Sequence, residues 1–237
     1  MKRFTAGASI CEVVFVFREC RVICLGLCDY KEAYMLQKQL LCRRIGQRVQ
    51  DTLVLMQHPS VFTIGRRGSR KNIIVNPEVL YREGILIYEA DRGGDITYHG
   101  PGQLVAYPIL DLNRHGRDVA RVINMYEEAV IKTLAGFNIE GSRIPEYPGV
   151  WVGNEKISAV GIGISNWVTY HGFSININTY LKHFSYIIPC GIKDRGITSM
   201  EKILGRKVDE ISVEEELVKA FGDTFNLEMK YQVKEQA

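Results

Sequence analysis

The 237-residue chain contains no apolar run that approaches the roughly 20 residues needed to cross a membrane as a helix. Its formal net charge is only +3, so no global excess of positive charge points to nucleic-acid binding. A short apolar patch at 13–17 is bracketed by charged residues and is followed by no small-residue cleavage site, which argues against a signal peptide. Repeats, low-complexity tracts and interdomain linkers are also missing. We therefore expect one globular domain with neither a membrane nor a nucleic-acid partner.

Cysteine is scarce and unevenly placed, with six in the chain and five of them before residue 43. This number and distribution do not suit a disulfide scaffold and fit a reducing, cytoplasmic setting. Cys20, Cys24 and Cys28 are evenly spaced, but no paired short spacing or nearby histidine completes a metal-ligand set. We expect them to pack as small buried hydrophobes on one face of a strand, and we predict no metal site.

Strand-like segments gather in the middle of the chain. Residues 1–20 lack periodicity and are predicted to form a poorly ordered extension, whereas 21–237 form the single domain. Apolar spacing predicts helices over 30–49 and 117–136 and, capped by Ser212, near the C terminus. Strands are expected at 21–27, 52–58, 60–65, 85–91, 96–100, 103–110, 149–152, 156–164 and 173–178, with a final edge strand within 229–237. This order predicts an α+β fold with helices packed on a mixed sheet.

Cys190 lies between Pro189 and Gly191. Proline fixes the backbone on one side, and glycine lets a substrate approach the backbone closely on the other. The thiolate is the nucleophilic form of cysteine, so a neighbouring group would have to lower the pKa of this thiol or take its proton. A buried structural cysteine is the alternative interpretation.

Lys156 enters the glycine-rich segment NEKISAVGIG. Strand alternation predicts that Lys156, Ser158 and Val160 share one face, and the glycines that follow leave room for something to lie close against the strand. A lysine in such a place could project into a desolvated site, where its pKa would fall. The alternative is a lysine in water at the end of a strand.

The segment RGGDITYHGPGQ, at 92–103, holds four glycines, a proline and a histidine. It is not a dinucleotide fingerprint, because the required spacing and the strand-to-helix context are both missing. His99 could shape a site for an acyl carbonyl, or it could be a structural histidine bonded to a backbone carbonyl. Asparagine is poor in strands, so we expect Asn176 and Asn178 to bond backbone groups near the site.

A cluster of positive charge stands out in this nearly neutral chain: Arg66, Arg67, Arg70 and Lys71. The cluster could be an ordinary solvated loop. It could also be a docking surface for an acidic partner, where charge would raise the rate of encounter more than the affinity. The sequence leaves both interpretations open.

These segments resemble the lipoyl(octanoyl) transferase family. The likeness extends over about residues 21–226 and includes TLVLMQHPSVFTIGRRG, RGGDITYHGPGQ, PGVWVGNEKISAVGIG, HGFSININ and PCGIKDRGITSM. The resemblance implies the single-domain α+β fold of the biotin and lipoate protein ligases. The extension at 1–20 and the early cysteines are not part of the family's pattern.

The resemblance also implies a reaction. An octanoyl group would pass from acyl carrier protein to Cys190 as a thioester, and then to the ε-amine of a lysine on a lipoyl domain, with Lys156 as acid–base partner. The implied acceptors are the lipoyl domains of 2-oxoacid dehydrogenase complexes and the glycine cleavage H protein; no cofactor is implied, and a monomer is expected. The implied substrate-binding residues are Arg92, Gly93, Gly94, Tyr98, His99, Gly100, Gly102, Gln103, Ser158, Ala159, Val160, Gly161, His171 and Gly172.

Two other functions stay open at this point. An ATP-dependent lipoate or biotin protein ligase of the same fold would make an acyl-adenylate and would need no nucleophilic cysteine. A non-catalytic module that binds acyl groups or carrier proteins would use Cys190 only for structure. Dependence on ATP and catalytic turnover distinguish these functions from the transferase.

Overall fold

The computed structural model describes residues 18–188 and 195–232. Its main feature is a large mixed sheet, made of β1 (Arg18–Leu27), β2 (Asp51–Gln57), β6 (Gln103–Ile109), β7 (Val150–Val152), β8 (Glu155–Ser165), β9 (Val168–Asn176), β10 (Gly196–Ile197) and β11 (Leu227–Tyr231). The strand order is β10-β8-β9-β6-β2-β1-β11, and β7 pairs with β8 outside this path. A small sheet of order β4-β3-β5 consists of β3 (Val61–Ile64), β4 (Leu86–Glu89) and β5 (Ile96–His99).

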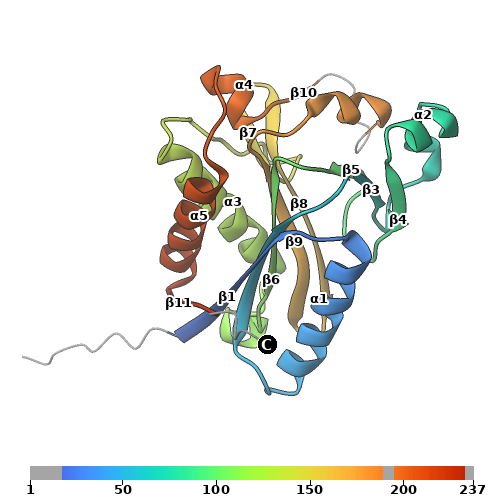
Figure 1. Ribbon diagram of the computed structural model, residues 1–237. Helices are drawn as coiled ribbons and strands as arrows, with labels where there is room; N and C mark the ends of the chain where they lie inside the picture. Colours follow the sequence, from blue (N-terminus) through green and yellow to red (C-terminus); the bar gives the residue numbers. More distant parts are fainter. Residues whose placement is uncertain (1–17, 189–194, 233–237) are drawn as a thin grey trace, which may run out of the picture.

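Helices cover both faces of the large sheet (Figure 1). Helix α1 (Tyr30–Ile45) packs on one face against β6 and β9, while α3 (Val119–Ala135) and α5 (Glu210–Phe225) pack together on the other. The predicted α+β architecture is therefore confirmed. No helix within the described ranges is long and apolar enough to cross a membrane. The shorter helical segments are α2 (Pro77–Arg82), α4 (Met200–Leu204), η1 (Arg70–Asn72), η2 (Leu112–Arg114) and η3 (Leu181–Tyr186).

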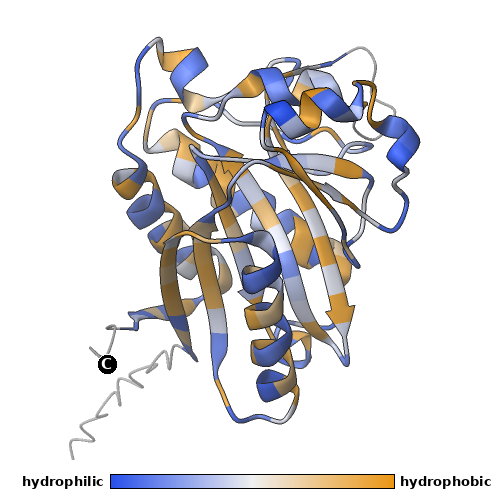
Figure 2. Cartoon of the chain, turned by 45° about the vertical axis from the view of Figure 1, so that its right-hand side comes forward, coloured by the Kyte–Doolittle hydropathy of each residue, from blue (hydrophilic) through white to orange (hydrophobic). Residues whose placement is uncertain are grey.

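Each face of the large sheet has its own hydrophobic core. In β2, Leu53 and Leu55 belong to the core under α3 and α5, whereas Val54 and Met56 belong to the core under α1. A strand buried on both faces needs apolar side chains at every position, which explains the unbroken run LVLM. Figure 2 shows the same contrast, with hydrophobic residues concentrated in the strands and the helices mixing both kinds.

The ends of all three predicted helices differ from the sequence-based expectations; α3 starts two residues later and ends one residue earlier than predicted. Helix α1 ends at Ile45, four residues before the predicted boundary, because the chain turns at Gly46. The last helix is capped by Asp209, not by Ser212: the Asp209 carboxylate accepts the Ser212 backbone N–H at 3.1 Å. Asp and Ser are both good caps, so the cap assignment was wrong by one turn.

Strand β1 corrects two further expectations. It begins at Arg18, so the last three residues assigned to the extension pair with neighbouring strands. Its register against β2 shifts between Cys24 and Leu27, and Gly26 there has a φ of +66°. Consequently Cys20 and Cys24 pack with one core and Cys28 with the other, rather than all on one face. Within the described part of the chain no group of side chains could hold a metal ion.

The C-terminal strand lies where the sequence predicted an edge strand. β11 occupies the end of the large sheet and pairs in parallel with β1, from Leu227 opposite Arg18 onward. It starts two residues earlier than expected because Asn226 ends α5 in the left-handed conformation, with a φ of 54°. Asparagine tolerates that conformation better than most residues, so the chain can pass directly from helix to strand.

Candidate active site

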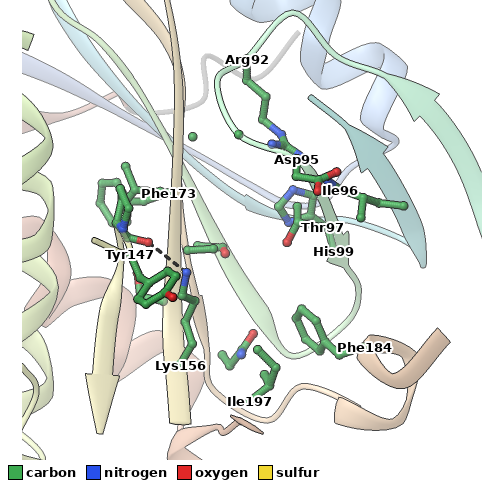
Figure 3. Close-up of a pocket in the computed structure, with 18 of the residues that line it drawn as sticks. Arg92, Asp95, Ile96, Thr97, His99, Tyr147, Lys156, Phe173, Phe184 and Ile197 are labelled. Carbon is green, nitrogen blue, oxygen red and sulfur yellow. Dashed lines mark hydrogen bonds between the residues drawn. The ribbon is translucent and has the colours of Figure 1, made fainter. Parts of the chain in front are cut away.

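A cavity of about 950 Å³ is lined by residues of both sheets. Strands β8 and β9 and the 92–95 loop that precedes β5 contribute much of the lining. In Figure 3, Lys156 lies on one side of the cavity, with Arg92 and His99 across from it. The fold thus brings together three segments that the sequence singled out separately.

Most of the predicted site residues line this cavity: Arg92, Gly93, Gly94, His99, Lys156, Ser158, Ala159, Val160, Gly161, His171 and Gly172. Tyr98, Gly100, Gly102 and Gln103 do not line it. Cys190 lies outside the described residues. The nearest described residues before and after it, Ile188 and Arg195, both line the cavity.

Lys156 is held at the cavity wall by its neighbours on β7 and the turn before it. The sheet pairs it with Trp151, and its Nζ lies 4.7 Å from the centre of the Trp151 ring. The same Nζ donates a hydrogen bond to the Pro148 carbonyl at 3.0 Å. On its other side, β10 pairs Ile197 with Lys156. These contacts fix the position of the ammonium group before any substrate binds.

The predicted alternation of side chains along β8 is wrong at one point. The register against β7 shifts between Val150 and Trp151, which inserts one extra residue into β8. Ile157 and Val160 therefore both pack with the core under α3, although strict alternation would put them on opposite faces. Lys156 consequently does not share its face with Val160. A bulge of this kind leaves no mark in the apolar pattern.

His99 is held from behind by a glutamine that does not itself line the cavity. Gln103 donates from Nε2 to the Tyr98 carbonyl at 3.2 Å and to Asn176 Oδ1 at 2.8 Å, so its Oε1 must accept from His99 Nδ1, 2.6 Å away. This network assigns the proton to Nδ1 and leaves Nε2 as an acceptor. Burial lowers the pKa of His99 to about 3, so the ring is neutral.

The two asparagines that are unusual in strands bond backbone groups, as predicted. Asn176 Nδ2 donates to the Thr198 carbonyl at 2.9 Å, and Asn178 Nδ2 donates to the Val208 carbonyl at 2.9 Å. Asn176 therefore joins the Gln103–His99 network to the segment that follows β10. Tyr98 does not line the cavity; its hydroxyl forms a hydrogen bond with His183 Nδ1 at 2.9 Å.

Arg92 fixes the loop that closes the cavity. Its NH2 donates to the Thr63 carbonyl at 2.7 Å, and its NH1 donates to the Gly93 carbonyl at 3.0 Å. The Gly93 N–H in turn donates to the Ile162 carbonyl of β8 at 2.8 Å. A Cβ at Gly161 would come within 3.0 Å of the Gly93 oxygen. Glycine at 161 therefore allows the loop to lie directly against the strand, as its place in the sequence suggested.

His171 occupies a strained backbone position, with a φ of 54°. Its Nε2 donates to Asp91 Oδ1 at 2.8 Å, and its backbone N–H donates to Gln37 Oε1 at 2.8 Å. The hydrogen bond from His171 holds the pKa of Asp91 below its ordinary value, while burial lowers the pKa of His171. The pair is therefore a carboxylate with a neutral imidazole. The sequence did not single out Asp91 or Gln37 as supports of the site, because neither belongs to a distinctive motif.

Tyr30 is a cavity residue that the sequence did not reveal. It is the first residue of α1, and its ring stacks on that of His99 with 6.5 Å between centres. Its hydroxyl is buried and finds no hydrogen-bond partner among the described residues. Burial also raises the pKa of Tyr30, so the group is a neutral donor. Only the helix start at Asp29–Tyr30 could have hinted at this placement.

The cavity lining combines the charged side chains of Lys156 and Arg92 with the neutral rings of His99 and His171 and with apolar side chains. Its apolar residues include Val105, Phe173, Phe184, Ile188 and Ile197. An acyl chain could pack against these side chains while its carbonyl carbon lies near Lys156. Such an arrangement suits acyl transfer, because proton transfer and chain binding are served by different parts of one cavity.

Residues 29–222 match the family model of the lipoyl protein ligase A/B catalytic domain. The chain belongs to this family. An octanoyltransferase of Caldicellulosiruptor saccharolyticus is 48% identical over 213 residues, which cover 89% of this chain and 91% of the relative. An octanoyltransferase of Desulforamulus reducens is 45% identical over 205 residues, covering 86% and 90%. The predicted family is confirmed.

Solved structures of the lipoyl protein ligase family have the same fold. A lipoate-protein ligase A bound with ATP matches with a TM-score of 0.69 at 15% identity, over 91% of this chain and 90% of that one. The biotin protein ligase of Aquifex aeolicus matches with a TM-score of 0.50 at 16% identity, over 89% of this chain and 70% of that one. The ligase-like fold expected from the sequence is thus confirmed.

Proposed function

We propose that this chain transfers an octanoyl group from a donor thioester to the ε-amine of a lysine on a lipoyl domain, and so acts in protein lipoylation. The observation that carries the proposal is the position of Lys156. Its ammonium group is fixed at a cavity wall, and Ile188 and Arg195 line the same cavity. Cys190 is one of the six residues that separate these two in the sequence.

The first half-reaction loads the protein. The Cys190 thiolate attacks the carbonyl carbon of octanoyl-acyl carrier protein, and a new carbon–sulfur bond forms as the bond to the pantetheine sulfur breaks. Lys156 donates its proton to the departing pantetheine thiolate. Backbone N–H groups stabilise the oxyanion of the tetrahedral intermediate, which is the usual device in acyl transfer.

The second half-reaction discharges the acyl group. Lys156, now neutral, takes a proton from the acceptor lysine amine as this amine attacks the Cys190 thioester. The carbon–nitrogen bond forms, the cysteine thiolate leaves, and Lys156 is again an ammonium group. The protons balance over one cycle. Exchange of one thioester for another is nearly balanced in energy and amide formation is downhill, so the reaction needs no ATP, metal or other cofactor.

The other cavity residues bind the acyl chain and shape the cavity that holds it. Arg92 anchors the loop that covers the acyl chain, and the neutral rings of His99 and His171 line the cavity without adding charge. Acyl carrier protein is the proposed donor. Lipoyl domains of 2-oxoacid dehydrogenase complexes and the glycine cleavage H protein are the proposed acceptors. A bipartite lipoate protein ligase of the same fold, from Thermoplasma acidophilum, forms a lipoylation system with its E2 lipoyl domain, which supports this class of acceptor.

A transfer assay tests the proposal. Octanoyl-acyl carrier protein and a lipoyl domain are mixed with the protein, with and without ATP. We expect ATP-independent turnover that is lost in Cys190→Ser and in Lys156→Ala. Modification of the acceptor only with ATP and free octanoate would identify a ligase. Stoichiometric binding without turnover would identify a binding module.

A further inference from the structure

The basic cluster of the sequence lies in the loop that leaves β3, which we call the basic loop (residues 65–72; Figure 1). The side chains of Arg66, Arg67, Arg70 and Lys71 are all exposed. Arg70 lies 3.4 Å from Glu89, with both partners largely in solvent. Among residues 18–188 and 195–232, no hydrogen bond or ion pair involves the side chain of Arg66, Arg67 or Lys71.

Glu89 is the only described carboxylate paired with a cation of the basic loop, and two other carboxylates on this side of the small sheet are bonded elsewhere within the protein. Asp95 accepts from Asn72 Nδ2 at 2.9 and 2.8 Å and from the Ile96 N–H at 2.6 Å. Glu83 lies near His183 and the Tyr186 hydroxyl, at 3.5 and 3.4 Å. Apart from Arg70, the cations of the basic loop therefore present positive charge to solvent that no described acid pairs with.

The basic loop is fixed to the wall of the active-site cavity. The backbone N–H groups of Gly65, Arg66 and Arg67 donate to the carbonyls of Asp95, Arg92 and Gly94, at 3.1, 3.0 and 3.1 Å. Arg67 also lines the cavity. A protein bound to the basic loop would consequently sit at the rim of the cavity, in a fixed position relative to the 92–95 loop.

We propose that the basic loop is the docking surface for the acidic carrier protein that delivers the acyl thioester; this proposal rests on the proposed function. The positive charge of the basic loop indicates an acidic partner. The distance from the 92–95 loop to Lys156 indicates that this partner is the acyl-carrying donor and not the lipoyl-domain acceptor. Gly93 bonds β8 at Ile162, six residues from Lys156, which corresponds to roughly 20 Å along a strand.

The arm of a donor carrier covers most of that distance, whereas the side chain of an acceptor lysine does not. Ordinary bond lengths give an extended phosphopantetheine arm roughly 18 Å, whereas a lysine side chain reaches only about 6 Å from its own backbone. A carrier protein docked on the basic loop can therefore bring its thioester within reach of the Lys156 amine, because the Lys156 side chain itself extends about 6 Å from the strand. An acceptor domain must instead bind close to Lys156 itself, away from the basic loop.

The expected effect is on the encounter step. Clustered charges of one sign raise the association rate of an oppositely charged partner by about 10- to 1,000-fold, and salt weakens this effect. We expect kcat/KM for octanoyl-acyl carrier protein to fall steeply as ionic strength rises. For octanoyl-pantetheine, which has no acidic protein attached, kcat/KM should be almost independent of salt.

The test compares charge reversal at two places. The double variant Arg66→Glu, Lys71→Glu alters the basic loop, while Arg43→Glu, Arg48→Glu makes the same change in charge on exposed residues at the far end of α1. In the basic-loop variant, kcat/KM for octanoyl-acyl carrier protein at low salt should fall at least tenfold. The value for octanoyl-pantetheine and that for the lipoyl-domain acceptor should stay within twofold of wild type, and the control should match wild type with all three substrates.

Four outcomes would overturn the proposal that the basic loop is the docking surface. They are an unchanged carrier-protein value, an equal loss with octanoyl-pantetheine, a loss confined to the acceptor, or an equal loss in the control. An equal loss with octanoyl-pantetheine would mean that the substitutions disturbed the cavity. Failure of the proposed function looks different, because the wild-type protein would then transfer octanoyl groups from neither donor.

Discussion

The ammonium group of Lys156 lies over the ring of Trp151, and Trp151 is 1% exposed. A cation over an indole face is stabilised by about 0.5–2 kcal/mol, and an arginine could occupy the same position. An arginine cannot carry out the proton transfers proposed for Lys156, because it stays protonated throughout the range in which proteins work.

Substitution of Lys156 by arginine or alanine distinguishes two possible roles of this residue, which are to supply a positive charge and to transfer a proton. We expect Lys156→Arg to lose at least 100-fold in the rate of octanoyl transfer, nearly as much as Lys156→Ala, since general acid–base catalysis contributes about 100- to 10,000-fold. Single-turnover kinetics of each half-reaction would measure this. A Lys156→Arg variant with near-normal rates would mean that the residue contributes only positive charge.

The cavity should discriminate between acyl chains by length. Each buried methylene contributes about 0.8 kcal/mol, so loss of two carbons should weaken binding by roughly 1.6 kcal/mol, or about 15-fold. Competition between hexanoyl and octanoyl donors measures this ratio directly. Equal use of the two donors would contradict a cavity matched to eight carbons.

The close contact between the 92–95 loop and β8 depends on glycine. In Gly161→Ala, the added methyl group would meet the Gly93 oxygen at 3.0 Å and Arg92 Cδ at 3.2 Å, so the loop must move outward. We expect kcat/KM for the octanoyl donor to fall about tenfold, which corresponds to the low end of overpacking strain. Gly46→Ala is the matched control, since its nearest contact would be an ordinary 3.5 Å and it lies away from the cavity. Equal activity of the two variants would show that the close approach is unnecessary.

Much of the fold and part of the cavity lining could be predicted from the sequence because they depend on local patterns. The apolar run of β2 and the spacing of α1 and α3 reflect burial on particular faces. The motifs around Arg92, Lys156 and His171 carry unusual glycines or polar residues, which single them out. These features are visible one segment at a time.

The remaining features depend on contacts between distant segments. The extra residue in β8 at Ile157 follows from its pairing with β7, and the support of His99 by Gln103 and Asn176 crosses three strands. Gln103 looked like a substrate-binding residue, but the structure places it behind His99. Tyr30 and Asp91 enter the site or its support only through the packing of α1 and the bend at His171.

Burial of neutral His99 should make the protein less stable in acid. The pKa of His99 is about 3 in the folded protein and near 6.5 in the unfolded chain, so the unfolded state binds a proton first as pH falls. The contribution of neutral His99 to the free energy of unfolding is fully present above about pH 6.5. It is lost progressively below that pH, and the loss is about 2 kcal/mol at pH 5.

Urea unfolding at pH 7.5 and pH 5.0 checks this prediction. Wild type should lose about 2 kcal/mol more of its unfolding free energy than His99→Gln does over the same interval. The contributions of the other buried histidines, His58 and His171, cancel in this comparison because both proteins contain them. Their pKa values are also lowered mainly by burial. Equal losses in the two proteins would show that the folded state does not lower the pKa of His99.

The most direct test of the covalent mechanism is the intact mass of the protein after reaction with octanoyl-acyl carrier protein in the absence of ATP. We predict one octanoyl adduct on Cys190; when a lipoyl domain is added, the adduct disappears from the protein and the octanoyl group appears on the lipoyl domain as an amide. A lipoyl domain that is octanoylated at the full rate by Cys190→Ser, with no adduct on the wild-type protein, would contradict the covalent mechanism.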